Sequence, residues 1–408
     1  MPTEVPLRRR PEQDGSVRRI LVMTVVHNPA DSRVWHREIG ALLASGWHVT
    51  YAAPFSGYGQ QPHTRDPRLP GSLSCLDIRR AAGRHRALAN HEARQVLKRL
   101  ARSHDLVLIH DPELLAAAAG LGLRHLVWDV HEDLAAALQV KQWVPTPLRP
   151  VLATTWRLLE RQVERSHELL LAESEYQRRF RRNHYVVPNA VSVPPETARP
   201  GTNRVVYLGT VTEARGCSLM IDVARSLSQL PGPPVQLEVI GDAPEKRCAD
   251  ALRRADRDGT LSWQGFLPSP SALSRLSGAL AGLSLLDDLP NFRCSLPTKV
   301  IEYAAVGIPV ITTPLPIAIG IVREANCGVV VPWRDPGAVV DAIAALRDDP
   351  ERAAMLGHNG HLAALNHYDW QTLSRRFVEH MALLAEAIAT RSAGTRVAAT
   401  WPAEASMS

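Results

Sequence analysis

Residues 291–310 read NFRCSLPTKVIEYAAVGIPV, and this stretch decides the fold class. Its first six residues are polar and predict a loop. The stretch 297–306 has a helical pattern with one apolar face. Gly307 suits the left-handed conformation that ends many helices, and a proline follows shortly after it. The apolar and β-branched residues 310–313 predict a short buried strand. The stretch is therefore one loop–helix–strand unit of an α/β protein.

Lys299 and Glu302 give this unit its chemistry. They are three residues apart, so we expect both side chains on the side of the helix away from the apolar face. The helix N-terminus and the loop before it offer free N–H groups and the positive end of the helix dipole, which suit a phosphate. One turn further on, the Glu302 carboxylate is placed to accept hydrogen bonds from a ribose diol. A surface ion pair between the two residues is the alternative interpretation of the same spacing.

Strand-like and helix-like patterns alternate in two series, one on each side of the Pro- and Thr-rich segment 192–203. The first series begins with the apolar run 20–26 and the second with 205–208. This order predicts two Rossmann-like halves with a cleft between them, and functional sites that line the cleft. No GxGxxG sequence follows the first strand, which argues against a dinucleotide-binding dehydrogenase.

The chain is thus predicted to be an α/β protein of two Rossmann-like domains. An apolar stripe of Phe377, Met381, Leu384 and Ile388 predicts the last helix. The predicted parts are a disordered basic tail (1–17), a first domain (18–191), a linker (192–203), a second domain (204–372), a last helix (373–390) and a disordered tail (391–408).

Composition limits the partners. The 408 residues carry a net charge of +6, which favours sugar nucleotides, phospholipid surfaces or nucleic acid. No zinc-finger spacing or aromatic RNA-binding signature supports nucleic acid. Five scattered cysteines and the lack of a signal peptide or a long apolar run predict a cytoplasmic protein. The basic residues of the predicted helix 148–168 and of 178–182 suit peripheral contact with an anionic membrane as well as an ordinary solvated face.

The sequence PTKVIEYAAVGIPVITT resembles the donor-binding segment of family 4 glycosyltransferases, which have the GT-B fold and retain the anomeric configuration of the donor. In that family a Glu-x7-Glu pair brackets the segment. Glu302 matches the second Glu, whereas Cys294 stands in place of the first. The resemblance implies that the nucleotide-sugar is held by Asn291, Phe292, Cys294, Ser295, Leu296, Lys299 and Glu302.

Other segments of the second half carry the same resemblance. VVYLGTVTEARG resembles the first donor-domain strand and its loop, with Gly209 at the turn. Arg215 stands where the family has a Lys that touches the diphosphate, and Thr210 replaces an Arg. VIGDAP and WQGFLP resemble the turns that contact the base, so Gly241 and Phe266 are expected beside it.

In the first half, LVWDVHED resembles the segment whose His lies near the donor hexose. We therefore predict His131 and Glu302 as the catalytic residues. DSRVWHREIGALLASGWHVT resembles the first loop and helix of the acceptor domain. This likeness places Asp31, Arg33 and also His110 on the acceptor side. A helix cap at Asp31 with a solvated Arg33 is the alternative.

The resemblance implies a GT-B fold in which 18–191 is the acceptor-binding domain, 204–372 is the nucleotide-sugar-binding domain and the crossover helix 373–390 returns to the first domain. It also implies transfer of a hexosyl unit from a UDP-, GDP- or dTDP-linked donor to a hydroxyl acceptor, with retention. The acceptor is a sugar, a lipid-linked molecule or a small molecule. No metal and no cofactor are expected, because a helix dipole and protein cations neutralise the diphosphate. A GT-B nucleotide-sugar epimerase and a non-catalytic nucleotide-sugar-binding protein are the alternatives. Nucleotide release that depends on an acceptor distinguishes the three.

Overall fold

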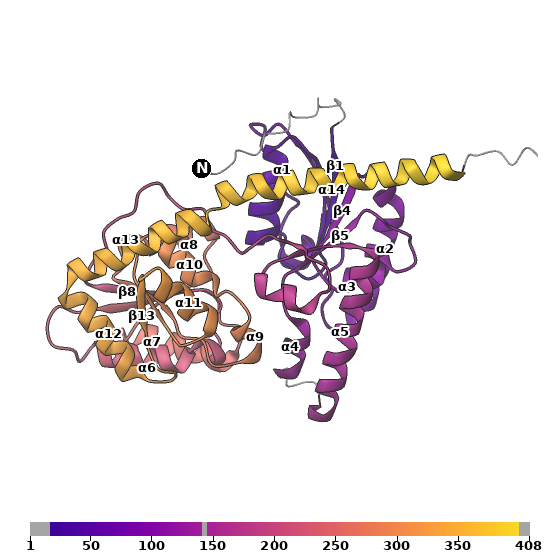
Figure 1. Ribbon diagram of the computed structural model, residues 1–408. Helices are drawn as coiled ribbons and strands as arrows, with labels where there is room; N and C mark the ends of the chain where they lie inside the picture. Colours follow the sequence, from indigo (N-terminus) through magenta and orange to yellow (C-terminus); the bar gives the residue numbers. More distant parts are fainter. Residues whose placement is uncertain (1–16, 141–144, 400–408) are drawn as a thin grey trace, which may run out of the picture. The chain divides into compact units, whose positions relative to one another are not determined.

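The computed structural model describes residues 17–140 and 145–399. Its first sheet has seven strands in the order β3-β2-β1-β4-β5-β6-β7. Three of them, β1, β4 and β5, are labelled in Figure 1. Ile20 pairs with Val49 on one side and with Leu106 on the other, both in parallel register. The central strands are almost wholly apolar because helices cover both faces of such a sheet. The strands are β1 (Arg19–Met23), β2 (His48–Ala53), β3 (Ser72–Asp77), β4 (Leu106–Ile109), β5 (Leu126–Val130), β6 (Glu168–Leu171) and β7 (Tyr185–Val186).

The second sheet has six parallel strands in the order β10-β9-β8-β11-β12-β13. A cluster of buried aliphatic residues fills the space between β8, β9, β11 and the helices on one face, and a second cluster lies under α10 on the other. The strands are β8 (Arg204–Leu208), β9 (Gln236–Ile240), β10 (Ser262–Gly265), β11 (Ala281–Ser284), β12 (Val310–Thr312) and β13 (Gly328–Val330).

Helices follow most strands in both series, as expected for two Rossmann-like α/β domains. With the first sheet they are η1 (Ser32–Ile39), α1 (Gly40–Ala44), η2 (Ser56–Tyr58), η3 (Gly83–His85), α2 (Arg86–Leu100), η4 (Ala101–Ser103), α3 (Glu113–Ala118), α4 (Leu134–Val140), η5 (Thr146–Leu148), α5 (Arg149–Ser166) and η6 (Ser174–Arg179). With the second sheet they are η7 (Glu213–Arg215), α6 (Cys217–Leu227), α7 (Lys246–Arg257), α8 (Ser269–Leu276), α9 (Pro290–Arg293), α10 (Thr298–Ala305), α11 (Pro316–Glu324), α12 (Pro336–Asp348), α13 (Pro350–His367) and α14 (Trp370–Ala399).

The described residues divide into two compact units, 17–128 with 378–399 and 129–140 with 145–377. α14 is one continuous helix whose part from Val378 onward belongs to the first unit, where Glu386 pairs with Arg18. The helix extends beyond 390, the limit expected from the sequence. The other predicted domain limits stay predictions. Most of the predicted tail 1–17 and the end of the tail 391–408 lie outside the described residues.

Three local predictions were wrong or incomplete. The stretch expected to be a loop before α10 contains the short helix α9, which begins at Pro290. Strand β3 and helix α2 were not predicted, because β3 is a half-exposed edge strand without a clear alternating pattern. The first strand ends at Met23 rather than at 26. Beyond it, the N–H of Val26 donates to the Asp111 carboxylate at 3.0 Å instead of to a neighbouring strand. Among the described residues, no helix is both long and apolar enough to cross a bilayer.

Candidate functional site

Lys299 on α10 is buried, with 7 % of its surface exposed. Its Nζ lies 3.8 Å from the centroid of the Tyr207 ring and has no hydrogen-bond partner among the described residues. The alternative interpretation, a surface ion pair with Glu302, is therefore wrong, because Lys299 is buried. A cation–π contact compensates only part of the cost of removing an ammonium group from water. The site thus holds a buried positive charge that lacks an anion.

Helix α10 is held rigidly because almost all of its sides are buried, not just one apolar face. The Tyr303 hydroxyl donates to the Leu283 carbonyl at 3.0 Å and accepts from the Leu208 N–H at 2.9 Å. A Cβ at Gly282 would lie 2.3 Å from the Tyr303 ring, so the ring needs a glycine there. These contacts fix α10 against β8 and β11. Gly307, at φ +73°, ends the helix in the left-handed conformation predicted for it.

The turn at Gly209 borders the Lys299 side chain. A Cβ at Gly209 would lie 3.8 Å from both Cε and Nζ of Lys299, and the residue has φ +116°. Gly241, at φ +148°, packs on the same turn, since a Cβ there would be 2.0 Å from the Gly209 carbonyl oxygen. The Gly209 N–H donates a hydrogen bond to the Ile240 carbonyl at 2.9 Å. The glycine of VIGDAP is thus needed for the close approach of two backbone turns.

Arg215, in η7, adds a second cation. Its guanidinium carbon lies 5.9 Å from the centroid of the Phe292 ring, and it has no ion-pair partner among the described residues. Asn291 presents a buried side-chain oxygen that likewise has no hydrogen-bond partner there. Burial lowers the pKa of Lys299 well below its usual value and the positive charge of Arg215 lowers it further, against the opposing effect of Glu302. An anion in this region would relieve both effects.

The other residues predicted to hold the donor differ in how exposed they are. Glu302 is half-buried on α10, and Cys294 is exposed at the C-terminal end of α9. Ser295 is half-buried, whereas Leu296 is buried and its N–H donates to the Glu173 carboxylate at 3.0 Å. Phe266 is 70 % exposed. α10 and its neighbouring turns therefore gather Gly209, Arg215, Phe292 and Lys299, while the ring of Phe266 faces solvent.

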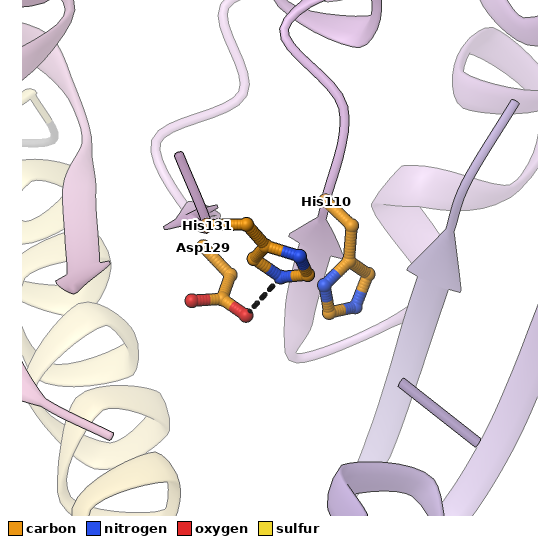
Figure 2. A group of neighbouring side chains, drawn as sticks. All are labelled: His110, Asp129 and His131. Atoms are coloured by element: carbon orange, nitrogen blue, oxygen red, sulfur yellow. Dashed lines mark hydrogen bonds and ion pairs between the residues drawn. The ribbon is translucent and has the colours of Figure 1, made fainter. Parts of the chain in front are cut away.

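His131 follows β5 and forms a hydrogen-bonded pair with Asp129. The His131 Nε2 lies 2.5 Å from the Asp129 carboxylate, whose side chain is fully buried. Figure 2 shows the His131 ring beside this carboxylate, with the His110 ring on its other side. The arrangement follows from the topology, since His110 comes directly after β4 and β4 pairs with β5 in parallel. A buried carboxylate fixes the tautomer and orientation of a neighbouring imidazole.

A second layer of charges lies behind His110. Its Nε2 is 3.7 Å from the Glu38 carboxylate, and Glu38 pairs with the buried Arg33 at 3.1 Å. The Asp31 side chain caps η1 by accepting from the N–H groups of Arg33 and Val34. The cap alternative therefore describes Asp31. Arg33 is buried and paired rather than solvated.

Two groups of side chains have the composition of metal ligands. His110, Asp129 and His131 each offer one ligand atom, and these atoms lie within 4.8 Å of one another. Glu213, Cys217 and Cys248 form the second group. Their chemistry would fit a transition metal. In the first group, however, the Asp129 carboxylate already bonds the His131 ring. In the second, burial raises the pKa values of both thiols, whereas a metal needs thiolates.

Sequence reasoning missed Asp111, a buried carboxylate that follows β4. It accepts from Thr24 Oγ1 at 2.7 Å, contacts His27 Nδ1 at 2.6 Å and accepts the backbone N–H groups at the end of β1. Burial alone would raise its pKa, but the His27 contact and these hydrogen bonds hold the pKa at about 2. Asp129 was also missed. An acidic residue inside the apolar run of a strand was the available signal in LVWDVHED.

The residues around α10 coincide with a known protein family. The family model described as "Glycosyl transferases group 1" matches residues 192–362, which contain the second sheet and α10. No curated protein matches the chain.

Solved structures share the fold of most of the chain. Sucrose-phosphate synthase from Thermosynechococcus elongatus aligns with a TM-score of 0.70 and 17 % identity, covering 91 % of this chain and 100 % of that one. WaaG, described as a glycosyltransferase involved in lipopolysaccharide biosynthesis, aligns at 0.64 with 14 % identity, covering 89 % and 99 %. Anabaena HepE in complex with UDP and glucose aligns at 0.63 with 14 % identity, covering 89 % and 99 %. The chain therefore has the GT-B fold, and its residues 192–362 match the group 1 glycosyltransferase model.

Proposed function

We propose that the protein is a retaining, metal-independent hexosyltransferase of family 4 type that uses a nucleotide-sugar donor and a hydroxyl acceptor. The observation that carries the proposal is the buried ammonium group of Lys299, which has no hydrogen-bond partner among the described residues. A diphosphate is the anion that such a site, with Arg215 nearby, fits best. The glycine turn at Gly209 borders the Lys299 ammonium group.

In this reaction the bond between the hexose C1 and the diphosphate oxygen breaks, and a bond forms between C1 and the acceptor oxygen. The acceptor proton passes to the leaving diphosphate, which departs from the face that the acceptor enters, so the configuration is retained. Negative charge accumulates on the leaving diphosphate, and positive charge develops on the hexose ring. Lys299 and Arg215 stabilise the negative charge on the diphosphate without a metal.

Glu302 and His131 have separate roles in the proposal. The half-buried Glu302 carboxylate accepts from the ribose hydroxyls, and the rigid position of α10 supports that role. His131 orients the hexose, and the bond to Asp129 keeps its imidazole in one orientation. Asp31, Arg33 and His110 stay predicted acceptor-side residues. The pairing of Arg33 with Glu38 implies that it acts through Glu38 and His110 rather than by direct contact.

The donor is a UDP-, GDP- or dTDP-linked hexose. The complexes of HepE with UDP and glucose and of TarM with UDP and α-GlcNAc-glycerol favour UDP among these. The acceptor class (a sugar, a lipid-linked molecule or a small molecule), the cytoplasmic location and the lack of a cofactor stay predictions from the sequence.

Thermal unfolding with UDP, GDP and dTDP tests the donor assignment. A nucleotide at about 100 times its Kd adds roughly 2.7 kcal/mol to the free energy of unfolding, so the correct base raises Tm clearly. Nucleotide release from the matching nucleotide-hexose is then measured with and without candidate acceptors. Release only with an acceptor supports a transferase. Release without one supports the epimerase alternative, and binding without release supports the non-catalytic alternative that Cys294 keeps open.

A further inference from the structure

Helix α5 and the turn before it expose an unusual number of large apolar side chains. The exposed fractions are 50 % for Leu148, 60 % for Val151, 40 % for Leu152, 59 % for Leu158 and 42 % for Leu159. At 3.6 residues per turn, these five side chains fall on one side of the helix within an arc of about 120°. We call them the α5 apolar stripe. Thr155 and Gln162 are also exposed within this arc. Single exposed leucines need no explanation, but five large apolar side chains on one side of a helix mark an interaction surface.

The inward side of α5 buries two glutamates beside the apolar Ala153 and Val163. Glu160 and Glu164 are 1 % and 3 % exposed. Glu160 pairs with Arg157 at 3.0 Å, and Glu164 accepts the backbone N–H groups of Arg181 and Arg182 at 2.7 Å. An ordinary surface helix turns its glutamates outward and its leucines inward. α5 does the reverse, so its outward side is adapted to an apolar environment.

The charges that α5 exposes are all positive. Arg161 and Arg165 are exposed, whereas both acidic residues of the helix are buried. Arg161 lies one turn after Leu158, and Arg165 lies one turn further on, so the cations border the α5 apolar stripe. Apolar side chains on one side with arginines at the border are the pattern of a helix that lies in the plane of a membrane interface.

We propose that the α5 apolar stripe docks on an anionic lipid surface, with Leu158 and Leu159 at the acyl boundary and Arg161 and Arg165 at the level of the headgroups. A second copy of the chain is the competing occupant. A two-fold contact would place the stripe of one copy against the same stripe of the other, and the arginines of both copies would then lie close together. No exposed carboxylate of α5 is present to neutralise them, so like charges would repel. Lipid phosphates supply that negative charge. The proposal does not depend on glycosyl transfer.

Vesicle flotation of the full chain tests the proposal. Vesicles of phosphatidylcholine alone are compared with vesicles of equal parts phosphatidylcholine and phosphatidylglycerol. The natural chain is expected to float with the anionic vesicles and to stay largely unbound with the neutral ones. L158S/L159S is expected to lower partitioning at least about tenfold. R161Q/R165Q is expected to lower partitioning onto anionic vesicles about thirtyfold and to weaken its salt dependence.

The control is L88S/L383S, because Leu88 and Leu383 are 56 % and 59 % exposed on α2 and α14, which matches Leu158. It is expected to float like the natural chain. All variants are checked for an unchanged melting curve and an unchanged shift with nucleotide, which separates this surface from the donor site.

Three results would overturn the proposal. They are no flotation of the natural chain with anionic vesicles, equal flotation of L158S/L159S and the natural chain, and equal binding to neutral and anionic vesicles. Sedimentation without lipid identifies the competing occupant. A dimer of the natural chain that L158S/L159S converts to a monomer would show that a second copy covers the stripe.

Discussion

Two regions of the molecule bury ionisable groups, and they treat them in opposite ways. Around His131 the charges compensate one another, since Asp129 bonds the imidazole and Glu38 lies between Arg33 and His110. Around α10, the ammonium group of Lys299 is buried with only an aromatic ring against it. The charged groups of the first region are paired within the protein, whereas the ammonium group of the second has no hydrogen-bond partner among the described residues.

The difference separates positioning from binding. A compensated network is rigid and holds its members in one orientation before any substrate arrives. An uncompensated buried cation destabilises the free protein, and an anionic ligand recovers that free energy on binding. We therefore expect changes around His131 to act mainly on turnover, and changes around α10 to act mainly on affinity.

The largest effect is expected from Lys299→Met, which removes the uncompensated charge but keeps most of the side-chain volume. Nucleotide affinity should fall by about 3–5 kcal/mol, the cost of removing one partner of a buried ion pair. The free protein should become more stable, because no ammonium group is desolvated on folding. Titration calorimetry and thermal unfolding measure the two effects. The matched control is Lys246→Met, at an exposed lysine on α7, which should change neither quantity.

The lowered pKa of Lys299 also gives a pH dependence. In the free protein the folded state binds this proton less tightly than the unfolded state, so stability should rise as pH increases toward the ordinary lysine pKa of about 10.4. Nucleotide binding should raise the pKa again and take up protons. Calorimetry in buffers of different ionisation enthalpy detects this uptake. Proton uptake that persists in Lys299→Met would mean that another group takes up the proton.

A smaller loss is expected from Glu302→Ala, which should weaken nucleotide binding by roughly 2–4 kcal/mol because two charge-assisted hydrogen bonds disappear. Glu302→Gln keeps the shape and should lose less. Cys294→Ser is the internal control: it should alter turnover modestly and leave nucleotide affinity unchanged, since a thiol is only a weak donor. Calorimetric titration of free nucleotide compares the three variants. Normal affinity in Glu302→Ala would remove the ribose role.

Asp129→Asn tests the role of the region around His131. The amide keeps the size of the carboxylate but no longer fixes the His131 tautomer, so kcat should fall about ten- to a hundredfold, less than the 10²–10⁴ lost with a whole acid–base group. The Kd of the nucleotide should not change. Steady-state kinetics and calorimetry on the same preparation give both numbers. Equal losses in kcat and in affinity would show that the two regions do not act separately.

The smallest effect is expected from metal removal. Turnover should survive EDTA, because Lys299 and Arg215 supply the positive charge for the diphosphate. Activity that disappears and returns with Mg²⁺ would contradict this. Return with Zn²⁺ instead would direct attention to the group of His110, Asp129 and His131, whose ligand atoms lie within 4.8 Å of one another.

Much of the fold was predictable from the sequence because its signals are local. The pattern of residues 297–313 gave α10, its left-handed end at Gly307 and the buried strand β12. The alternation of apolar runs on both sides of 192–203 indicated two parallel sheets. Edge elements such as β3 were not predicted, since a half-exposed strand has little hydrophobic pattern.

The candidate site divides in the same way. The sequence indicated Lys299 and Glu302 by their spacing on a predicted helix, and the resemblance to family 4 glycosyltransferases favoured them, together with His131 after a predicted strand, as site residues. Whether a charge is compensated was decided only by the tertiary structure. The pairing of β4 with β5 brings His110 to His131 and Asp129, and the packing of α10 on β8 and β11 buries Lys299 against Tyr207. Desolvation depends on what surrounds a side chain in space, and the neighbours of Lys299 come from segments about 90 residues away in the sequence.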